Sequence, residues 1–371
     1  MIDRGVCTVG RHPSCSGVGV REAPLWGWMK MHRPIAAASA FALLLTACVQ
    51  HAPPGPAGPT PGAVLFDPPR DQAHPARNRQ LVIPSGPVRP ELGRWAEMNA
   101  LFLLASGEGP KPTMLLLHGL PGNERNLDLA QAVRRAGWNV LTFTYRGAWG
   151  SEGTFSIQHA VDDTQAALGF LRLPQTAMDY GVDTSRIVVA GHSMGGYMAA
   201  HVGALDAACE GPRPAAGPVL PLAMTGSRIA PHCSSFPPLA GVVLLDAWNI
   251  AVTAREAKAA GEAGRAAFVA GFDDVGHSLG PITPADLADE VIRRGEQWDL
   301  QALAPKLARL PVLSIYARHG IAADNVAVVT ALRAQPGSRV QAREMDTDHS
   351  FADHRIWLAA EVVRWLEALP K

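Results

Sequence analysis

Short apolar runs without polar alternation recur along the chain from residue 114 onward. Such runs predict strands buried on both faces, as in a parallel sheet covered by helices. In order, the runs are Met114–Leu117, Asn139–Tyr145, Ile187–Ala190, Gly241–Leu245, Val312–Tyr316 and Val340–Met345. Helical patterns lie between or after them, including Asn126–Gly137, His159–Leu173 and a closing helix over Arg355–Leu369. Strands that alternate with helices in this way predict an α/β fold.

Some segments depart from this alternation. Gln80–Ile83 and Ala100–Ala105 are separated by Pro and Gly residues and are predicted to pair antiparallel at one edge of the sheet. Residues 205–240 are rich in proline. Residues 248–308 are helical in pattern, with an Ala-rich stretch over Thr253–Ala270 and a helix with one charged face over Pro284–Glu296.

The run Ile187–Ala190 leads directly into Gly-His-Ser-Met-Gly-Gly, and a helix of small residues is predicted to follow over Tyr197–Ala204. Glycines remove side chains where a sharp strand-to-helix turn would otherwise crowd itself, which leaves Ser193 at the tip of the turn. The following helix directs its N-terminal N–H groups and the positive end of its dipole toward any oxyanion that forms nearby. The pattern predicts a nucleophile elbow with Ser193 as the nucleophile.

The N-terminal region has the anatomy of a signal peptide over residues 29–47. A short basic start precedes the apolar run Ile35–Leu45, which is too short to span a bilayer as a stable helix, and small residues precede Cys48. Leu45-Thr-Ala-Cys48 resembles a bacterial lipobox, which implies cleavage before Cys48 and attachment of lipid to that residue. The alternative is a buried helix that ends in an ordinary cysteine.

If the lipobox is used, residues 1–28 are expected to be a mis-assigned start or a disordered leader. The Pro-rich residues 48–79 would form a semi-extended tether between the lipid and a folded domain over residues 80–371. The expected location is the bacterial cell envelope, on the periplasmic side, with the membrane bound through the lipid anchor at Cys48.

Export changes the interpretation of the five cysteines. Cys7 and Cys15 fall in the leader and Cys48 would carry lipid, which leaves Cys209 and Cys233. An even pair in an oxidising compartment predicts a disulfide, which would contribute roughly 3 kcal/mol through the unfolded state. The alternative is two separate buried thiols.

Composition excludes several classes of function. The chain of 371 residues is 47% hydrophobic and 18% charged, enough to bury a full core, and its formal net charge is zero. The sequence has no basic patch of the kind that indicates a nucleic-acid partner. No spacing of His and Cys suggests a metal site.

The elbow and the order of elements together resemble the α/β-hydrolase family over about residues 80–370. His118-Gly-Leu-Pro-Gly122 resembles the turn after the third strand in that family, and Tyr145-Arg-Gly-Ala-Trp-Gly-Ser151 resembles the loop after the fourth. The resemblance implies that the backbone N–H groups of Leu120 and Met194 form an oxyanion hole. It also implies that residues 248–308 sit over the mouth of the site as a cap; a packing helix pair with no gating role is the alternative.

A serine nucleophile needs a neutral imidazole to take its proton. Asp348-His-Ser-Phe351 resembles the family's C-terminal loop that carries the general base, and His349 is the candidate because it follows the last strand and precedes the closing helix. His354 is the fallback. Asp348 adjoins His349 and is expected to point away from it.

The acid that orients this imidazole is where the chain departs from the family. The usual carboxylate follows the Val312–Tyr316 strand, but the loop here, Ala317-Arg-His-Gly320, contains none. Asp324 lies slightly further along, although it could simply cap a helix that begins at Asn325. Asp246 ends the Gly241–Leu245 strand, although it could simply bond the next loop. Both remain candidates.

These features predict a serine hydrolase that cleaves an ester, or less readily an amide, of a small-molecule acyl substrate through an acyl-enzyme, without a cofactor. A serine aminopeptidase or an acyltransferase would use the same chemistry. A catalytically idle hydrolase fold that serves as a lipid-tethered binding protein is the alternative from another class, favoured by the missing carboxylate.

Overall fold

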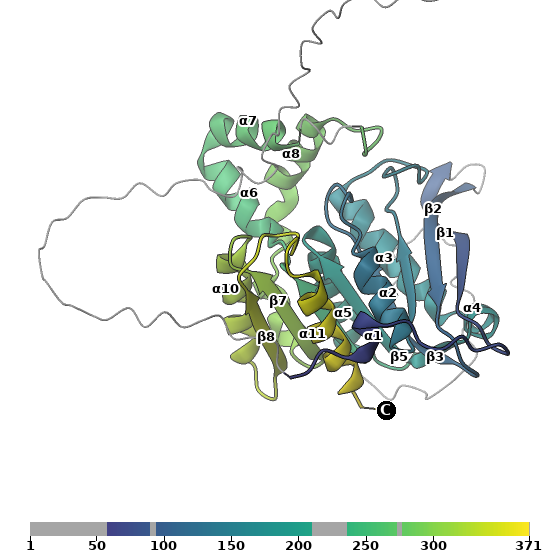
Figure 1. Ribbon diagram of the computed structural model, residues 1–371. Coiled ribbons are helices and arrows are strands. Elements are labelled where there is room, and N and C mark those ends of the chain that lie inside the picture. Colours follow the sequence, from purple (N-terminus) through teal and green to yellow (C-terminus); the bar gives the residue numbers. More distant parts are fainter. Residues whose placement is uncertain (1–57, 90–93, 210–235, 273–276, 371) are drawn as a thin grey trace, which may run out of the picture.

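The computed structural model describes residues 58–89, 94–209, 236–272 and 277–370 (Figure 1). The predicted leader, signal peptide and lipidation site at Cys48 lie outside these residues, as do Cys233 and most of the Pro-rich segment 205–240. None of the helices in the described ranges combines the length and the apolar character that a membrane-spanning helix requires.

The described residues form an eight-stranded sheet in the order β1-β2-β4-β3-β5-β6-β7-β8. The strands are β1 Arg77–Arg89, β2 Arg94–Leu104, β3 Lys111–Leu117, β4 Asn139–Phe143, β5 Val182–His192, β6 Gly241–Leu245, β7 Pro311–Ala317 and β8 Arg339–Met345. β1 and β2 pair antiparallel at one edge, as predicted, and β3 to β8 are parallel.

Helices cover both faces of this sheet, which confirms the predicted α/β-hydrolase fold. They are α1 Gly62–Leu65, α2 Leu127–Arg135, α3 Ile157–Arg172, α4 Pro174–Tyr180, α5 Met194–Ala207, α6 Ile250–Ala259, α7 Gly261–Gly271, α8 Pro284–Arg294, α9 Ala304–Leu307, α10 Ala322–Arg333 and α11 Arg355–Glu367. Short 3₁₀ turns occupy Gly295–Gln297 and Gln301–Leu303.

The unbroken apolar runs of the central strands explain this layering. Leu115 and Leu117 of β3 belong to the core on the α3 and α5 side, whereas Met114 and Leu116 belong to the core on the α2 and α11 side. Successive side chains point to opposite faces of a strand, so a strand buried on both faces needs apolar residues at every position.

The helical segment between β6 and β7 differs in detail from the prediction. The Ala-rich stretch Thr253–Ala270 is two helices, α6 and α7, because the chain breaks at Ala260 and Gly261, where Gly261 adopts φ +61°. α6, α7 and α8 stand together beyond one end of the sheet (Figure 1). α6 starts just after the carboxyl end of β6, so this group lies at the edge where the parallel strands end.

The folded body begins before Gln80. α1 packs on α2 and α11, and Arg135 donates hydrogen bonds to the carbonyls of Ala63 and Val64. Arg364 of α11 donates to the carbonyls of Gly58 and Pro59. The described part of the predicted tether, from residue 58, is therefore attached to the surface of the domain.

Candidate active site

Ser193 occupies the turn between β5 and α5 with φ 56° and ψ −119°, a conformation that non-glycine residues rarely adopt. The turn is held on both sides: the Ser193 N–H donates to the carbonyl of Leu245 at 3.0 Å, and its carbonyl accepts from the Trp248 N–H at 2.9 Å. A Cβ on Gly195 would lie 2.4 Å from the carbonyl oxygen of Leu117. Glycine at this position lets α5 start directly against the end of β3.

His349 lies on the loop between β8 and α11 and is buried. Its Nδ1–H donates to Oδ2 of Asp246 at 2.5 Å. A carboxylate only accepts, so the proton of the neutral ring is held on Nδ1 and the lone pair is left on Nε2. That is the protonation state in which an imidazole can take a proton from a serine hydroxyl.

Asp246 follows the last residue of β6 and is fully buried, with φ 39°. Besides His349, it accepts the backbone N–H groups of Ala317 at 3.2 Å and Ile321 at 3.1 Å and the side-chain amide of Asn325 at 3.3 Å. Four donors thus satisfy the buried carboxylate. The contribution of Asn325 was not predicted, because in the sequence it is only one polar residue within an expected helix.

The loop after β7 contains no acid because it lies against the acid from the neighbouring strand. A Cβ on Gly320 would lie 2.0 Å from Oδ2 of Asp246 and 3.1 Å from Cα of His349. No side chain fits there without displacing the Asp246 carboxylate. The loop instead supplies the two backbone N–H groups that hold Asp246.

Asp324 does not make the contact to His349. The prediction that Asp324 could cap a helix starting at Asn325 is wrong, because α10 begins three residues earlier and Asp324 lies inside its first turn. Burial raises the pKa of Asp324 to about 6, with further contributions from Glu256 and Asp246.

The His118–Gly122 turn lies directly against the nucleophile: a Cβ on Gly119 would lie 2.9 Å from Cβ of Ser193. The Nδ1–H of His118 donates to the carbonyl of Gly119 at 2.7 Å, and burial lowers the pKa of His118 to about 4. Met194 is the first residue of α5, so its N–H is one of the four that have no acceptor within the helix. Met194 follows Ser193 in the sequence, and Leu120 follows Gly119, the residue that lies against Ser193.

The fallback base His354 and the acid next to His349, Asp348, both bond within the C-terminal loop. Asp348 accepts the backbone N–H of Ala352. His354 precedes α11, and its Nδ1–H donates to Asp353 at 2.8 Å. Ser193, Asp246 and His349 follow the carboxyl ends of the parallel strands β5, β6 and β8, so the structure brings all three to one end of the sheet.

The segment before α8 is tied to the loop after β4. Ala148 and Leu279 form an isolated antiparallel bridge, and the Trp149 N–H donates to the carbonyl of Ser278 at 2.9 Å. The helical insertion is therefore attached to the Tyr145–Ser151 loop as well as to the end of β6.

Cys209 follows α5 and is disulfide-bonded. Its predicted partner, Cys233, is not among the described residues, so the pairing of these two cysteines stays a prediction.

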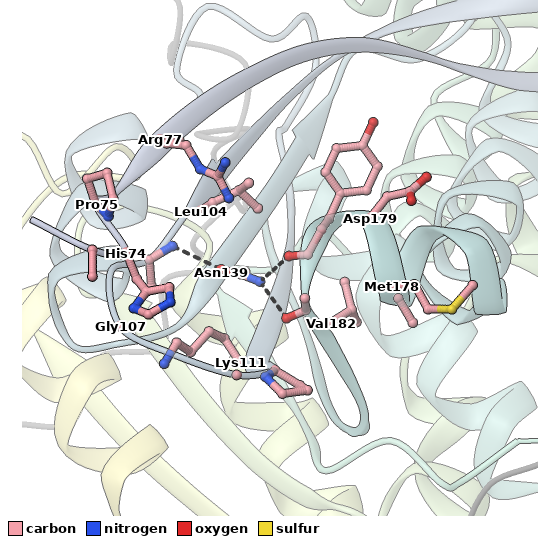
Figure 2. Close-up of a pocket in the computed structure, with 17 residues that line it drawn as sticks. His74, Pro75, Arg77, Leu104, Gly107, Lys111, Asn139, Met178, Asp179 and Val182 are labelled. Atoms are coloured by element: carbon pink, nitrogen blue, oxygen red, sulfur yellow. Dashed lines mark hydrogen bonds between the residues drawn. The ribbon is translucent and has the colours of Figure 1, made fainter. Parts of the chain in front are cut away.

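A cavity of about 610 Å³ lies at the opposite end of the strands from Ser193, where β3, β4 and β5 begin (Figure 2). Lys111, Asn139 and Val182, the first residues of β3, β4 and β5, line it. The side-chain amide of Asn139 donates to the carbonyls of Tyr180 and Gly181 (Figure 2). None of the three candidate catalytic side chains lines this cavity, because they all follow the carboxyl ends of their strands.

Comparison with known proteins agrees with the fold. A model of the alpha/beta hydrolase family matches residues 114–362. A curated relative, the alpha/beta hydrolase domain-containing protein WAV2 of Arabidopsis thaliana, is 35% identical over 105 residues. That match covers 28% of this chain and 32% of WAV2, so the chain spans about a third of the length of that relative.

Solved structures show the same fold at low identity. A hyperthermophilic esterase from Pyrobaculum calidifontis superposes with a TM-score of 0.50 at 18% identity, covering 80% of this chain and 87% of the esterase. A bacterial brefeldin A esterase superposes with a TM-score of 0.50 at 17% identity, covering 81% and 79%. A 2,6-dihydroxy-pseudo-oxynicotine hydrolase gives 0.50 at 17% identity, covering 80% and 68%.

Proposed function

Because the chain belongs to the alpha/beta hydrolase family, we propose that it is a serine hydrolase that cleaves an ester through an acyl-enzyme. The observation that carries the proposal is the 2.5 Å hydrogen bond from His349 Nδ1 to Asp246. It fixes the proton of a buried imidazole on Nδ1, so that Nε2 is the basic nitrogen, at the end of the sheet where Ser193 is held in a strained turn.

In the proposed reaction, Nε2 of His349 takes the proton of the Ser193 hydroxyl as its oxygen attacks the acyl carbon. The N–H groups of Leu120 and Met194 stabilise the oxyanion, and Asp246 stabilises the imidazolium. His349 then gives the proton to the departing alkoxide. Water, activated by the same imidazole, hydrolyses the acyl-enzyme and regenerates Ser193.

The feature that favoured an idle binding protein was the missing carboxylate after β7. Asp246 offers a carboxylate to His349 from β6, so that feature no longer favours the idle alternative. An ester is preferred to a peptide as substrate because esterases are among the solved structures that share this fold.

A fluorophosphonate probe tests the nucleophile. The full-length protein should be labelled covalently and should hydrolyse short p-nitrophenyl esters, and Ser193→Ala should lose both properties. The proposal is refuted if the probe labels the wild-type protein no faster than it labels Ser193→Ala.

The helices α6, α7 and α8 are proposed to form a cap over the substrate. Their position at the carboxyl edge of the sheet and the bridge to the loop after β4 support this role. A cap would shape the acyl pocket and exclude water from the reaction.

The protein is further proposed to be an exported lipoprotein of the bacterial envelope, anchored through Cys48. The disulfide at Cys209 supports this location, because disulfides persist in oxidising compartments. Metabolic labelling with a radioactive fatty acid should mark the wild-type protein in membranes, and Cys48→Ala should carry no label.

A further inference from the structure

His192, the residue before Ser193, makes a direct contact with the loop of the base. Its Nε2–H donates to the backbone carbonyl of His349 at 2.7 Å, and the centroids of the two imidazole rings lie 4.6 Å apart. One residue comes from the end of β5 and the other from the loop after β8, so the bond joins segments that are distant in the sequence.

The contacts of His192 define its protonation. A carbonyl oxygen only accepts, so Nε2 carries a proton. Nδ1 is buried and has no hydrogen-bond partner among the described residues. A second proton on Nδ1 would be buried without an acceptor, so the ring is neutral. Burial, together with the nearby His349, lowers the pKa of His192 well below its usual range.

We propose that His192 is a positioning residue that fixes the base relative to the nucleophile through the hydrogen bond from its Nε2–H to the carbonyl of His349. The inference rests on the proposed serine hydrolase function. Asp246 holds the His349 ring at Nδ1, and His192 holds the His349 backbone. With both anchors, the direction of Nε2 is determined, and the second anchor is covalently adjacent to Ser193.

The neutral state of His192 also serves the reaction. A positive charge on this ring would stand beside the imidazolium that forms on His349 and would oppose its formation. His192 therefore donates one hydrogen bond, adds no charge and does not compete as a second base.

Two variants separate the hydrogen bond from the packing of the ring. His192→Gln keeps an N–H donor on a side chain of similar reach, whereas His192→Leu keeps apolar volume without a donor. We expect the Leu variant to lose about 10- to 100-fold in kcat with KM changed less than about threefold, because a displaced base misaligns the reacting atoms. The Gln variant should remain within about threefold of the wild type.

His354→Leu is the matched control, since it removes a histidine from the same loop without touching this bond, and its kcat should not change. A Leu variant as active as the wild type, or a folded Gln variant as impaired as the Leu variant, would overturn the inference.

A second readout does not depend on catalysis. The low-field proton NMR signal of the His349 Nδ1–H···Asp246 bond should be present in the wild type and the Gln variant and should shift or broaden in the Leu variant. If Ser193-dependent labelling is absent from the wild type, the proposed function fails, and this signal still decides whether His192 positions His349. An unchanged signal in all variants would refute that role.

Discussion

Replacing Asp246 by Asn tests the assignment of the acid. The Oδ1 atom of Asp246 accepts from Ala317 and Asn325, and Oδ2 accepts from Ile321 and His349. An amide has one accepting oxygen and one donating NH₂ group, so it can satisfy only one of these two pairs.

Each orientation of the amide has its own cost. With the NH₂ group toward His349, the imidazole must accept at Nδ1 and carry its proton on Nε2, which can then no longer take a proton from Ser193. With the NH₂ group away from His349, the donors of Ala317 and Asn325 lose their acceptor. Each buried donor left unsatisfied costs about 1–3 kcal/mol of folding free energy.

We expect Asp246→Asn to lower kcat by about 10⁴-fold, equivalent to about 5 kcal/mol of activation free energy. Initial rates with a p-nitrophenyl ester measure this loss, and urea unfolding followed by circular dichroism separates it from loss of folding. Asp324→Asn is the matched control and should stay within about threefold of the wild type. The reasoning is refuted if Asp246→Asn retains more than a tenth of the activity while folded, or if Asp324→Asn falls as far.

Three further predictions concern stability. Gly320→Ala should reduce both activity and stability, the latter by about 1–3 kcal/mol in urea unfolding, because its Cβ would meet the Asp246 carboxylate; an unchanged variant would contradict the geometry. The pKa of Asp324 is about 6 in the folded chain, against 3.8 for an ordinary aspartate, so the folded state holds this proton more tightly than the unfolded state. Protonation of Asp324 therefore adds to the free energy of unfolding below about pH 4, and this contribution is lost as the pH rises to 6. Asp324→Asn should accordingly be more stable than the parent at pH 7, by about 1–2 kcal/mol after allowance for partial exposure, and the two unfolding curves should converge toward pH 4. Asp163→Ala should lose about 3–5 kcal/mol, because it removes the fully buried carboxylate that pairs with the Arg146 guanidinium at 2.5 Å; Asp162→Ala, which removes the exposed and more distant partner of the same arginine at 3.8 Å, should change the urea midpoint little.

Much of the fold follows from local pattern. Unbroken apolar runs mark the central strands because those strands are buried on both faces, and the glycines around Ser193 mark the turn because no side chain fits there. The start of α10 was misplaced because its N-cap is Ile321, which provides no capping side chain, whereas Asp324 resembles a cap in the sequence.

The choice between Asp246 and Asp324 could not be made from the sequence. A parallel sheet brings the carboxyl ends of its strands to one edge, so acids after β6 and after β7 both arrive near His349. Which of them reaches Nδ1 depends on the path of the loop after β7, and that path is set by contacts between residues far apart in the chain. The bond from His192 to His349 depends on the same long-range packing.

The position of β7 between β6 and β8 has a consequence for how this domain tolerates change. Adjacent strands lie about 4.8 Å apart, so Asp246 and the root of the loop that carries His349 are separated by roughly twice that distance. The bond between them crosses the end of a strand that contributes no side chain to it. Because Gly320 lies against both Asp246 and His349, one bulky residue inserted into the connection over residues 317–321 would push these two groups apart. Arg318 and His319 on the same connection instead point outward and pair with acids on or after β8.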